Sequence, residues 1–299
     1  MKKVIFSAIA ASMILGVSAQ AKVESKAEGT QPATVKQINT ATVKQAKSDA
    51  ISHQQKMVQE AIDSLKNAHE ALVLLDKKDK DGAVKSIEKA LGKLEVILSA
   101  KTSPKLLPIK SYVVVNEFIG TSDGIKATVK LAKELLGDGK VQQARKLLMP
   151  LTSEVDMTTV SLPLISYPDA LKLAAKYIHS DKIAMAKEVL AIALNTFDEA
   201  TVIVPLPLLK ATDLIAAASD VATKDKALAL RYLDGASENL KVADALGYVS
   251  KSTVTYQVLQ DKIDAVKKEI KGKNKAEKLF DSLKEKLADF KAKVFSPKK

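Results

Sequence analysis

Side chains able to perform nucleophilic, acid–base or metal chemistry are few in this sequence. Cysteine is absent, which excludes thiolate nucleophiles, disulfides and cysteine-ligated metals. The three histidines, His53, His69 and His179, stand far apart, and none has a partner at the four-residue spacing of helical metal sites. Each is expected to be a solvated side chain. The sequence therefore predicts no metal site and no cofactor.

Two carboxylates, Glu154 and Asp156 in the stretch LTSEVDMTT, are the best candidates for acid–base chemistry. A pair of acids can hydrolyse a glycosidic bond, so a cell-wall hydrolase is the enzymatic alternative. We expect the pair to lie in a turn before a buried segment, where capping and hydrogen bonds to loop amides explain it better. Gly124, Gly137 and Gly139 form no phosphate-binding loop. The prediction is a protein that is not an enzyme and has no catalytic residues.

The first residues, MKKVIFSAIAASMILGVSAQAK, have the layout of a secretory signal peptide. Two lysines precede an apolar stretch from Val4 to Val17, and a small-residue triplet ends at Ala21. Cleavage is expected between Ala21 and Lys22, which predicts an exported, periplasmic protein. The apolar stretch is too short for a membrane span, which needs about 20 residues. No later segment holds 18 consecutive apolar residues, so no transmembrane segment is expected in the mature chain.

The formal net charge is +12, and lysine supplies nearly all of the positive charge, since Arg145 and Arg231 are the only arginines. Nucleic-acid sites favour arginine forks and stacking aromatic rings, whereas aromatic residues make up 4% of this chain and tryptophan is absent. We therefore expect no nucleic-acid partner. A solvated lysine-rich surface explains the charge better than binding of anionic envelope material, which stays open as an alternative.

From about residue 35, apolar residues recur every three or four positions, which is the period of an amphipathic helix. Helices are predicted over 56–75, from 84 to a stop before Pro104, over 124–136, from 141 to 148, and over 169–178, 184–194, 208–218 and 227–242. Short polar turns such as GDGK join them in pairs. The predicted fold class is all-α, with successive antiparallel helical hairpins joined by short turns and extended Pro-Leu crossover segments.

An internal repeat marks these crossovers. A shift of 42 residues places VSLPLISYPDALKLAA over VIVPLPLLKATDLIAA, and PKLLPI at 104–109 is a degenerate copy. The residue before a proline is disfavoured in the helical region, so extended backbone is expected at Leu162, Tyr167, Val204 and Leu206. We interpret both long stretches as crossovers buried against helices, with few hydrogen-bonding partners.

Two prolines of these stretches, Pro168 and Pro207, are expected at the first position of a helix, where the missing N–H costs nothing. A small-molecule groove beside the crossovers is the functional hypothesis, and its candidate residues are Tyr167, Pro168, Pro205 and Pro207. The alternative is that the tyrosines pack in the core with their hydroxyls hydrogen-bonded.

Three stretches resemble the YfdX-like family of bacterial exported proteins. They are LLMPLTSEVDMTTVSLPLISYPDALKLAAKYI (147–178), IALNTFDEATVIVPLPLLKATDLIAAAS (192–219) and LGYVSKSTVTYQVL (246–259). The resemblance covers about residues 55–270. It implies a mostly helical periplasmic protein linked to stresses such as acid, heat or drug exposure, and it supplies no catalytic residues. We expect a non-enzymatic protein that binds or protects client proteins or amphipathic small molecules.

The predicted domains are a signal peptide (1–21), a disordered leader (22–34), a helical YfdX-like domain (35–270) and a C-terminal segment (271–299). This last segment holds ten lysines and four acids around an apolar stripe that includes Phe280 and Phe290, which predicts a basic amphipathic helix. We expect it to pack on its own domain or on a second subunit of a homo-oligomer. The alternative is an envelope adaptor that binds anionic lipid or polymer through this helix.

Overall fold

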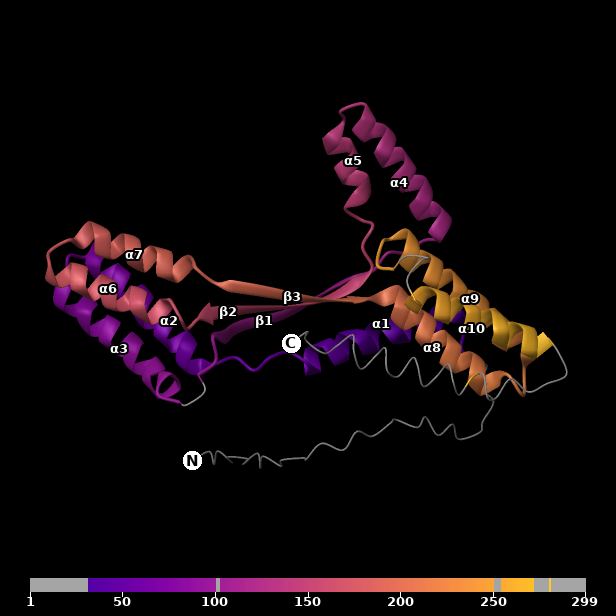
Figure 1. Cartoon of the computed structure of the whole chain (residues 1–299), viewed down its shortest axis with the longest axis horizontal. Helices are drawn as coiled ribbons and strands as arrows, with labels where there is room; N and C mark the ends of the chain where they lie inside the picture. The colour runs from indigo at the N-terminus through magenta and orange to yellow at the C-terminus, as the bar shows by residue number, and fades with distance from the viewer. Residues whose placement is uncertain (1–31, 101–102, 250–253, 272–279, 281–299) are drawn as a thin grey trace, which may run out of the picture. The chain divides into compact units, whose positions relative to one another are not determined.

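The computed structural model describes residues 32–100, 103–249, 254–271 and 280 (Figure 1). The predicted signal peptide, nearly all of the leader and most of the C-terminal segment lie outside these residues. Every element below belongs to the compact unit that begins at Thr34. Within the described ranges, no helix is both long enough and apolar enough to cross a bilayer.

The described part of the chain consists of ten helices and three strands. In chain order they are α1 (Val35–Ser52), α2 (Gln59–Asp76), α3 (Lys80–Leu98), β1 (Leu106–Asn116), α4 (Ser122–Gly137), α5 (Val141–Leu148), β2 (Glu154–Pro163), α6 (Tyr167–His179), α7 (Ile183–Asn195), β3 (Asp198–Pro205), α8 (Leu206–Val221), α9 (Lys226–Ala245) and α10 (Val254–Lys271).

The eight helices predicted from periodicity are present as α2 to α9, with small shifts at their ends. Side-chain caps explain where several of them begin. Asp79, Thr121 and Asp225 each accept a hydrogen bond from the backbone N–H three residues later. At the start of α1, Thr34 and Gln37 form a reciprocal capping box. These signals are local, so the sequence alone places the helices well.

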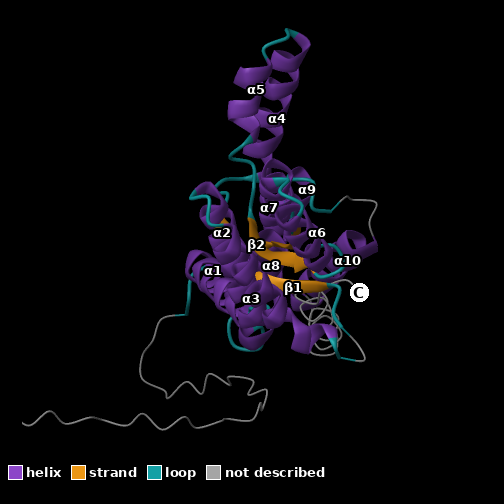
Figure 2. Cartoon of the chain, turned by 90° about the vertical axis from the view of Figure 1, so that its left-hand side faces the viewer, coloured by secondary structure: helices purple, strands orange, loops and turns teal. Residues whose placement is uncertain are grey.

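The structure corrects the all-α prediction, because the crossover segments belong to a three-stranded antiparallel sheet in the order β1-β2-β3. The fold is mostly helical, as Figure 2 shows, with the sheet as its smaller part. Leu162 of β2 pairs with Leu107 of β1, and Val155 of β2 pairs with Val204 of β3. The prediction that these segments have few hydrogen-bonding partners is therefore wrong, since they pair with one another.

The prolines of the repeat mark the ends of these strands. Pro163 is the last residue of β2, and Pro205 is the last residue of β3. Leu162 and Val204 are extended, as predicted, whereas Tyr167 and Leu206 are the first residues of α6 and α8. The prolines that follow them therefore stand second in each helix, not first. The first helical turn tolerates this because its N–H groups have no partner inside the helix.

Because successive strands run in opposite directions, the hairpins between them alternate between the two ends of the sheet. At the end formed by Leu107 and Leu162, α2, α3, α6 and α7 make a four-helix group in which α2 contacts α3 and α7, while α6 contacts α3 and α7. At the other end of β2, α8 follows β3 and packs against α9 and α1.

Three hydrophobic clusters hold these elements. The four-helix group buries residues such as Leu75, Ile87, Leu171 and Leu190. A second cluster joins α8, α9 and α10 and includes Phe280, the one described residue of the stripe predicted in the C-terminal segment. In the third, Ala46 and Ala50 of α1 lie against Val155, Met157 and Val204, so α1 covers one face of the sheet.

Candidate functional site

An apolar cavity of about 220 Å³ lies where β2 leads into α6, next to the last turns of α7. The α6–α7 hairpin is antiparallel and turns at Ser180–Lys182, so the start of α6 faces the end of α7. The residues that line the cavity are Pro163, Ser166, Tyr167, Ala170, Val189, Ile192, Ala193 and Thr196.

Small side chains create this space. Ala174 and Ala186 are fully buried and let α6 and α7 approach closely along the middle of the hairpin. Near the strand, Ala170 and Ala193 line the cavity together with the larger side chains of Tyr167 and Ile192, and alanine is too short to fill such a space. The walls of the cavity are thus mostly carbon atoms, and its polar lining residues are Ser166 and Thr196.

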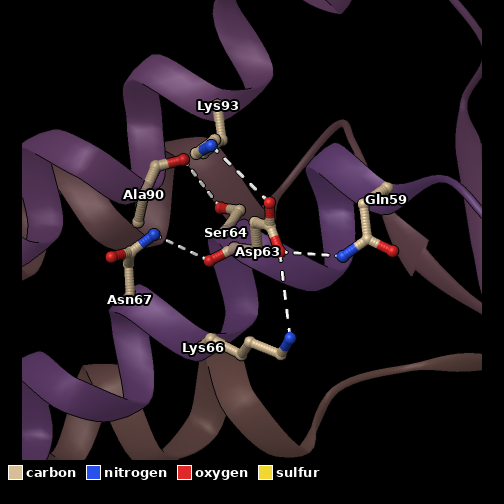
Figure 3. Close-up of polar contacts among 7 residues, drawn as sticks. All are labelled: Gln59, Asp63, Ser64, Lys66, Asn67, Ala90 and Lys93. Atoms are coloured by element: carbon tan, nitrogen blue, oxygen red, sulfur yellow. Dashed lines mark hydrogen bonds and ion pairs between the residues drawn. The ribbon is translucent and has the colours of Figure 1, made fainter. Parts of the chain in front are cut away.

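Tyr167 connects the cavity wall to the core of the four-helix group. Its hydroxyl is buried beside Ser64 of α2, and burial raises the pKa of Tyr167 to about 12, an effect that the Ser64 hydroxyl partly offsets. Ser64 donates its own hydrogen bond to the backbone carbonyl of Ala90 in α3, at 2.7 Å (Figure 3). The buried Tyr167 hydroxyl itself has no hydrogen-bond partner in the described part of the chain, so hydrophobic packing holds the side chain in the wall.

A polar cluster on α2 and α3 surrounds this contact. Asp63 accepts a hydrogen bond from Gln59 at 2.8 Å and lies 3.6 Å from the ammonium of Lys93 and 3.9 Å from that of Lys66 (Figure 3). The Gln59 hydrogen bond is the largest cause of a lowered pKa of Asp63; burial opposes it, and the two lysines add to it. The contact with Lys93 joins α2 to α3, whereas Gln59 and Lys66 belong to α2 itself.

The structure separates the four residues of the predicted groove. Tyr167 lines the cavity, and the neighbouring Pro168 is buried in the first turn of α6. Pro205 pairs with Glu154 at the opposite end of β2, and Pro207 follows it into α8. The predicted groove is thus divided between the two ends of the sheet, and one of its residues belongs to the cavity.

The other lining residues lie mainly on α7 and were missed by the sequence reasoning. Four of them are spaced three, one and three residues apart: Val189, Ile192, Ala193 and Thr196. This spacing places them on one side of the end of α7. Because most residues of α7 are apolar, no local signal in the sequence distinguishes these four from the rest of the helix.

Glu154 and Asp156 lie in strand β2 instead of the predicted turn. They point to the same face of the sheet, and Asn116 of β1 donates a long hydrogen bond of 3.4 Å to Asp156. Burial raises the pKa of Asp156, and the charge of Glu154 raises it further. Tyr248 accepts a hydrogen bond from the backbone N–H of Ser153 at 2.9 Å, which ties the loop after α9 to the start of β2. These hydrogen bonds thus link β1, the start of β2 and the loop after α9.

The histidines occupy surface positions. His53 caps the end of α1, with Nδ1 2.8 Å from the carbonyl of Asp49, while His69 and His179 are exposed on α2 and α6. Among the residues that the structure describes, no three side chains of the metal-binding types come together.

A match to a known family coincides with this region. The family model of the YfdX protein matches residues 65–203. Residues 65–203 are thus similar to the YfdX family. Among solved structures, YfdX of Salmonella Typhi matches at 15% identity with a TM-score of 0.35, covering 50% of this chain and 93% of that chain. No curated protein matches. All of the residues that line the cavity fall within the YfdX match, whereas α1, α8, α9 and α10 lie outside it.

Proposed function

We propose that this protein is a non-enzymatic, exported, stress-associated protein that binds apolar or amphipathic small molecules in the cavity between β2, α6 and α7. The observation that supports the proposal most is the lining of that cavity, in which six of the eight side chains present carbon or aromatic surface. Ligand sites of this kind are mostly apolar, with a small number of polar groups that orient the ligand.

The dimensions indicate the class of ligand. An engineered cavity of about 150 Å³ is enough to bind benzene. The volume here, about 220 Å³, leaves room for a molecule with two fused rings. Since no charged side chain lines the cavity, the buried part of the ligand should be uncharged, because an unpaired charge loses hydration on burial. A polar group of the ligand would lie at the exposed Ser166 or Thr196.

A titration with 1-naphthylamine, whose fluorescence depends on the polarity around it, tests the proposal. Ile192→Asp places a carboxylate at the cavity wall without disturbing the core, since Ile192 is exposed. We expect binding to weaken about tenfold or more. Met185→Asp is the matched control, because Met185 is also exposed on α7 but does not line the cavity. Absence of binding to the wild type, or equal weakening by both variants, would contradict the proposal.

Binding of client proteins is the second candidate, and the exposed apolar side chains near the cavity favour it. Three exposed apolar residues lie in the connection between β2 and β3: Ile165, Ile192 and Phe197. Such residues can hold an extended apolar segment of an unfolding protein. Light scattering of a heated or acidified client, with the same two α7 variants, measures this activity. If neither the wild type nor Ile192→Asp changes the aggregation of the client, client binding is contradicted.

Export is the part of the proposal that rests on the first 21 residues. Cell fractionation together with the mass of the purified chain tests it directly. The expected result is a periplasmic protein whose first residue is Lys22, and a cytosolic protein that keeps Met1 would contradict it.

A further inference from the structure

Three helical hairpins of this fold share the same turn. Lys78, Gly139 and Asp181 each adopt a positive φ, of 65°, 73° and 57°, between the two helices of α2–α3, α4–α5 and α6–α7. In each turn this residue donates its N–H to the carbonyl three residues back, and the next residue donates to the carbonyl five residues back. The turns therefore align the three hairpins residue by residue. Each residue of α2–α3 corresponds to the residue 61 positions later in α4–α5, and each residue of α4–α5 corresponds to the residue 42 positions later in α6–α7.

The alignment first identifies the contact inside each hairpin. Two positions hold alanine in all three hairpins and are buried in all of them. The first set is Ala71, Ala132 and Ala174, and the second is Ala83, Ala144 and Ala186. These alanines let the paired helices approach closely. All three hairpins are thus built in the same way.

Two further positions differ in a way that reveals an uncovered surface. In α2–α3 they are Leu75 and Ile87, with 2% and 1% of their surface exposed, and in α6–α7 they are Ile178 and Leu190, with 4% and 0%. These side chains are buried because the two hairpins pack on each other, α2 against α7 and α3 against α6. In α4–α5 the same positions are Leu136 and Leu148, and they are 47% and 40% exposed.

We infer that the α4–α5 hairpin docks on the α4–α5 hairpin of a second copy of this chain, as α2–α3 docks on α6–α7 within one copy. Within the described residues, the main contacts of α4 are with its partner α5 and with α9, and α9 does not cover Leu136 or Leu148. The partner is a second hairpin of this type, because the chain already shows which surface buries these two positions. This inference concerns assembly and is independent of the proposed ligand.

The symmetry of the intrachain pair makes a second copy a suitable occupant. The first helix of each hairpin contacts the second helix of the other, which is an approximate two-fold relation. A hairpin that pairs in this way can pair with itself, α4 against the partner's α5 and α5 against the partner's α4, to give a closed dimer. Arg145 occupies the position of Lys187, which lies 2.6 Å from Asp76 across the intrachain interface. Asp138, which pairs with Lys140 at 3.0 Å, follows the position equivalent to Asp76, so an acidic side chain stands next to that position.

Sedimentation equilibrium of the purified full chain, compared with two leucine variants of α4, tests the inference. Leu131 and Leu136 are equally exposed, at 47%. The positions equivalent to Leu131 are Glu70 and Leu173, which stay exposed when their hairpins pack, so Leu131 lies off the predicted interface. We expect a wild-type dimer, an unchanged dimer for Leu131→Asp, and a dissociation constant raised about 100-fold or more for Leu136→Asp, since each dimer carries the charge twice.

Four outcomes would overturn the inference. A wild type that stays monomeric at about 100 µM has no such interface. A dimer that Leu136→Asp leaves intact, or that both aspartate variants weaken alike, uses another surface. A monomer that dimerises only after removal of residues 272–299 would assign the hairpin surface to the chain's own C-terminal segment. Circular dichroism of the variants confirms that their helices are retained.

Discussion

At the scale of single residues, Tyr167 combines a place in the cavity wall with a hydroxyl in the core. The hydroxyl is buried beside Ser64, and the ring belongs to the cluster of the four-helix group. Removing water from a phenol disfavours its ionised form, which is why the pKa of Tyr167 rises to about 12. The folded protein therefore keeps this proton at a pH where an unfolded tyrosine, with a pKa of about 10, has lost it.

Tyr167→Phe should consequently change the alkaline stability of the protein. The raised pKa means that the folded state binds more protons than the unfolded state between pH 10 and pH 12, so the free energy of unfolding falls as the pH rises through that window. Phenylalanine removes this contribution. Urea unfolding at pH 8 to 12 should show the variant gaining up to about 2 kcal/mol relative to wild type by pH 12, with little change at pH 8. A constant difference at every pH would contradict this assignment.

The sequence named Tyr167 as a site residue but also named Pro205 and Pro207, which lie elsewhere. Pro163 and Pro205 occupy equivalent places in the 42-residue repeat, so a pattern cannot distinguish them. Their separation comes from antiparallel pairing, which puts Pro163 and Pro205 at opposite ends of β2. Such pairing depends on distant parts of the chain. A repeat in the sequence does not show whether the two repeated segments run parallel or antiparallel to each other.

At the scale of secondary structure, the helices were predictable and the strands were not, for a physical reason. A helix is specified by residues three and four apart and by its caps, all of which lie in one stretch of sequence. A strand is specified by partners that lie far along the chain; Val115 of β1, for example, pairs with Val155 of β2. The β-branched run from Val113 to Val115 was the local signal for β1.

The assignment of residues 198–205 as a strand predicts that neighbouring substitutions will differ. Val204 is fully buried against α1, whereas the adjacent Ile203 is 53% exposed on the other face of the sheet. Val204→Ala should lower the free energy of unfolding by about 2 kcal/mol, and Ile203→Ala by less than about 1 kcal/mol. Urea denaturation of both variants measures the difference. Equal losses would fit the unpaired crossover that the sequence suggested and would speak against a strand.

At the scale of the whole molecule, the buried side chains form separate clusters. The four-helix group of α2, α3, α6 and α7 shares no buried residue with the cluster of α8, α9 and α10. The strands of the sheet connect the two groups along the chain, and α1 packs on the sheet through a third cluster. The YfdX match covers most of the first group and stops before α8. Local opening of one group should therefore leave the other largely intact.

Leu171→Ala tests this independence. Leu171 is fully buried in the four-helix group, so its truncation should lower stability by about 2 to 5 kcal/mol. Native-state hydrogen exchange should then accelerate in α2, α3, α6 and α7, while the amides of α8 and α9 keep their wild-type protection. Leu233→Ala is the matched control, since Leu233 is equally buried in the α8–α10 cluster and should produce the opposite pattern. If either substitution accelerates exchange equally in both groups, they unfold as one cooperative unit, and the separation of their cores has no energetic meaning.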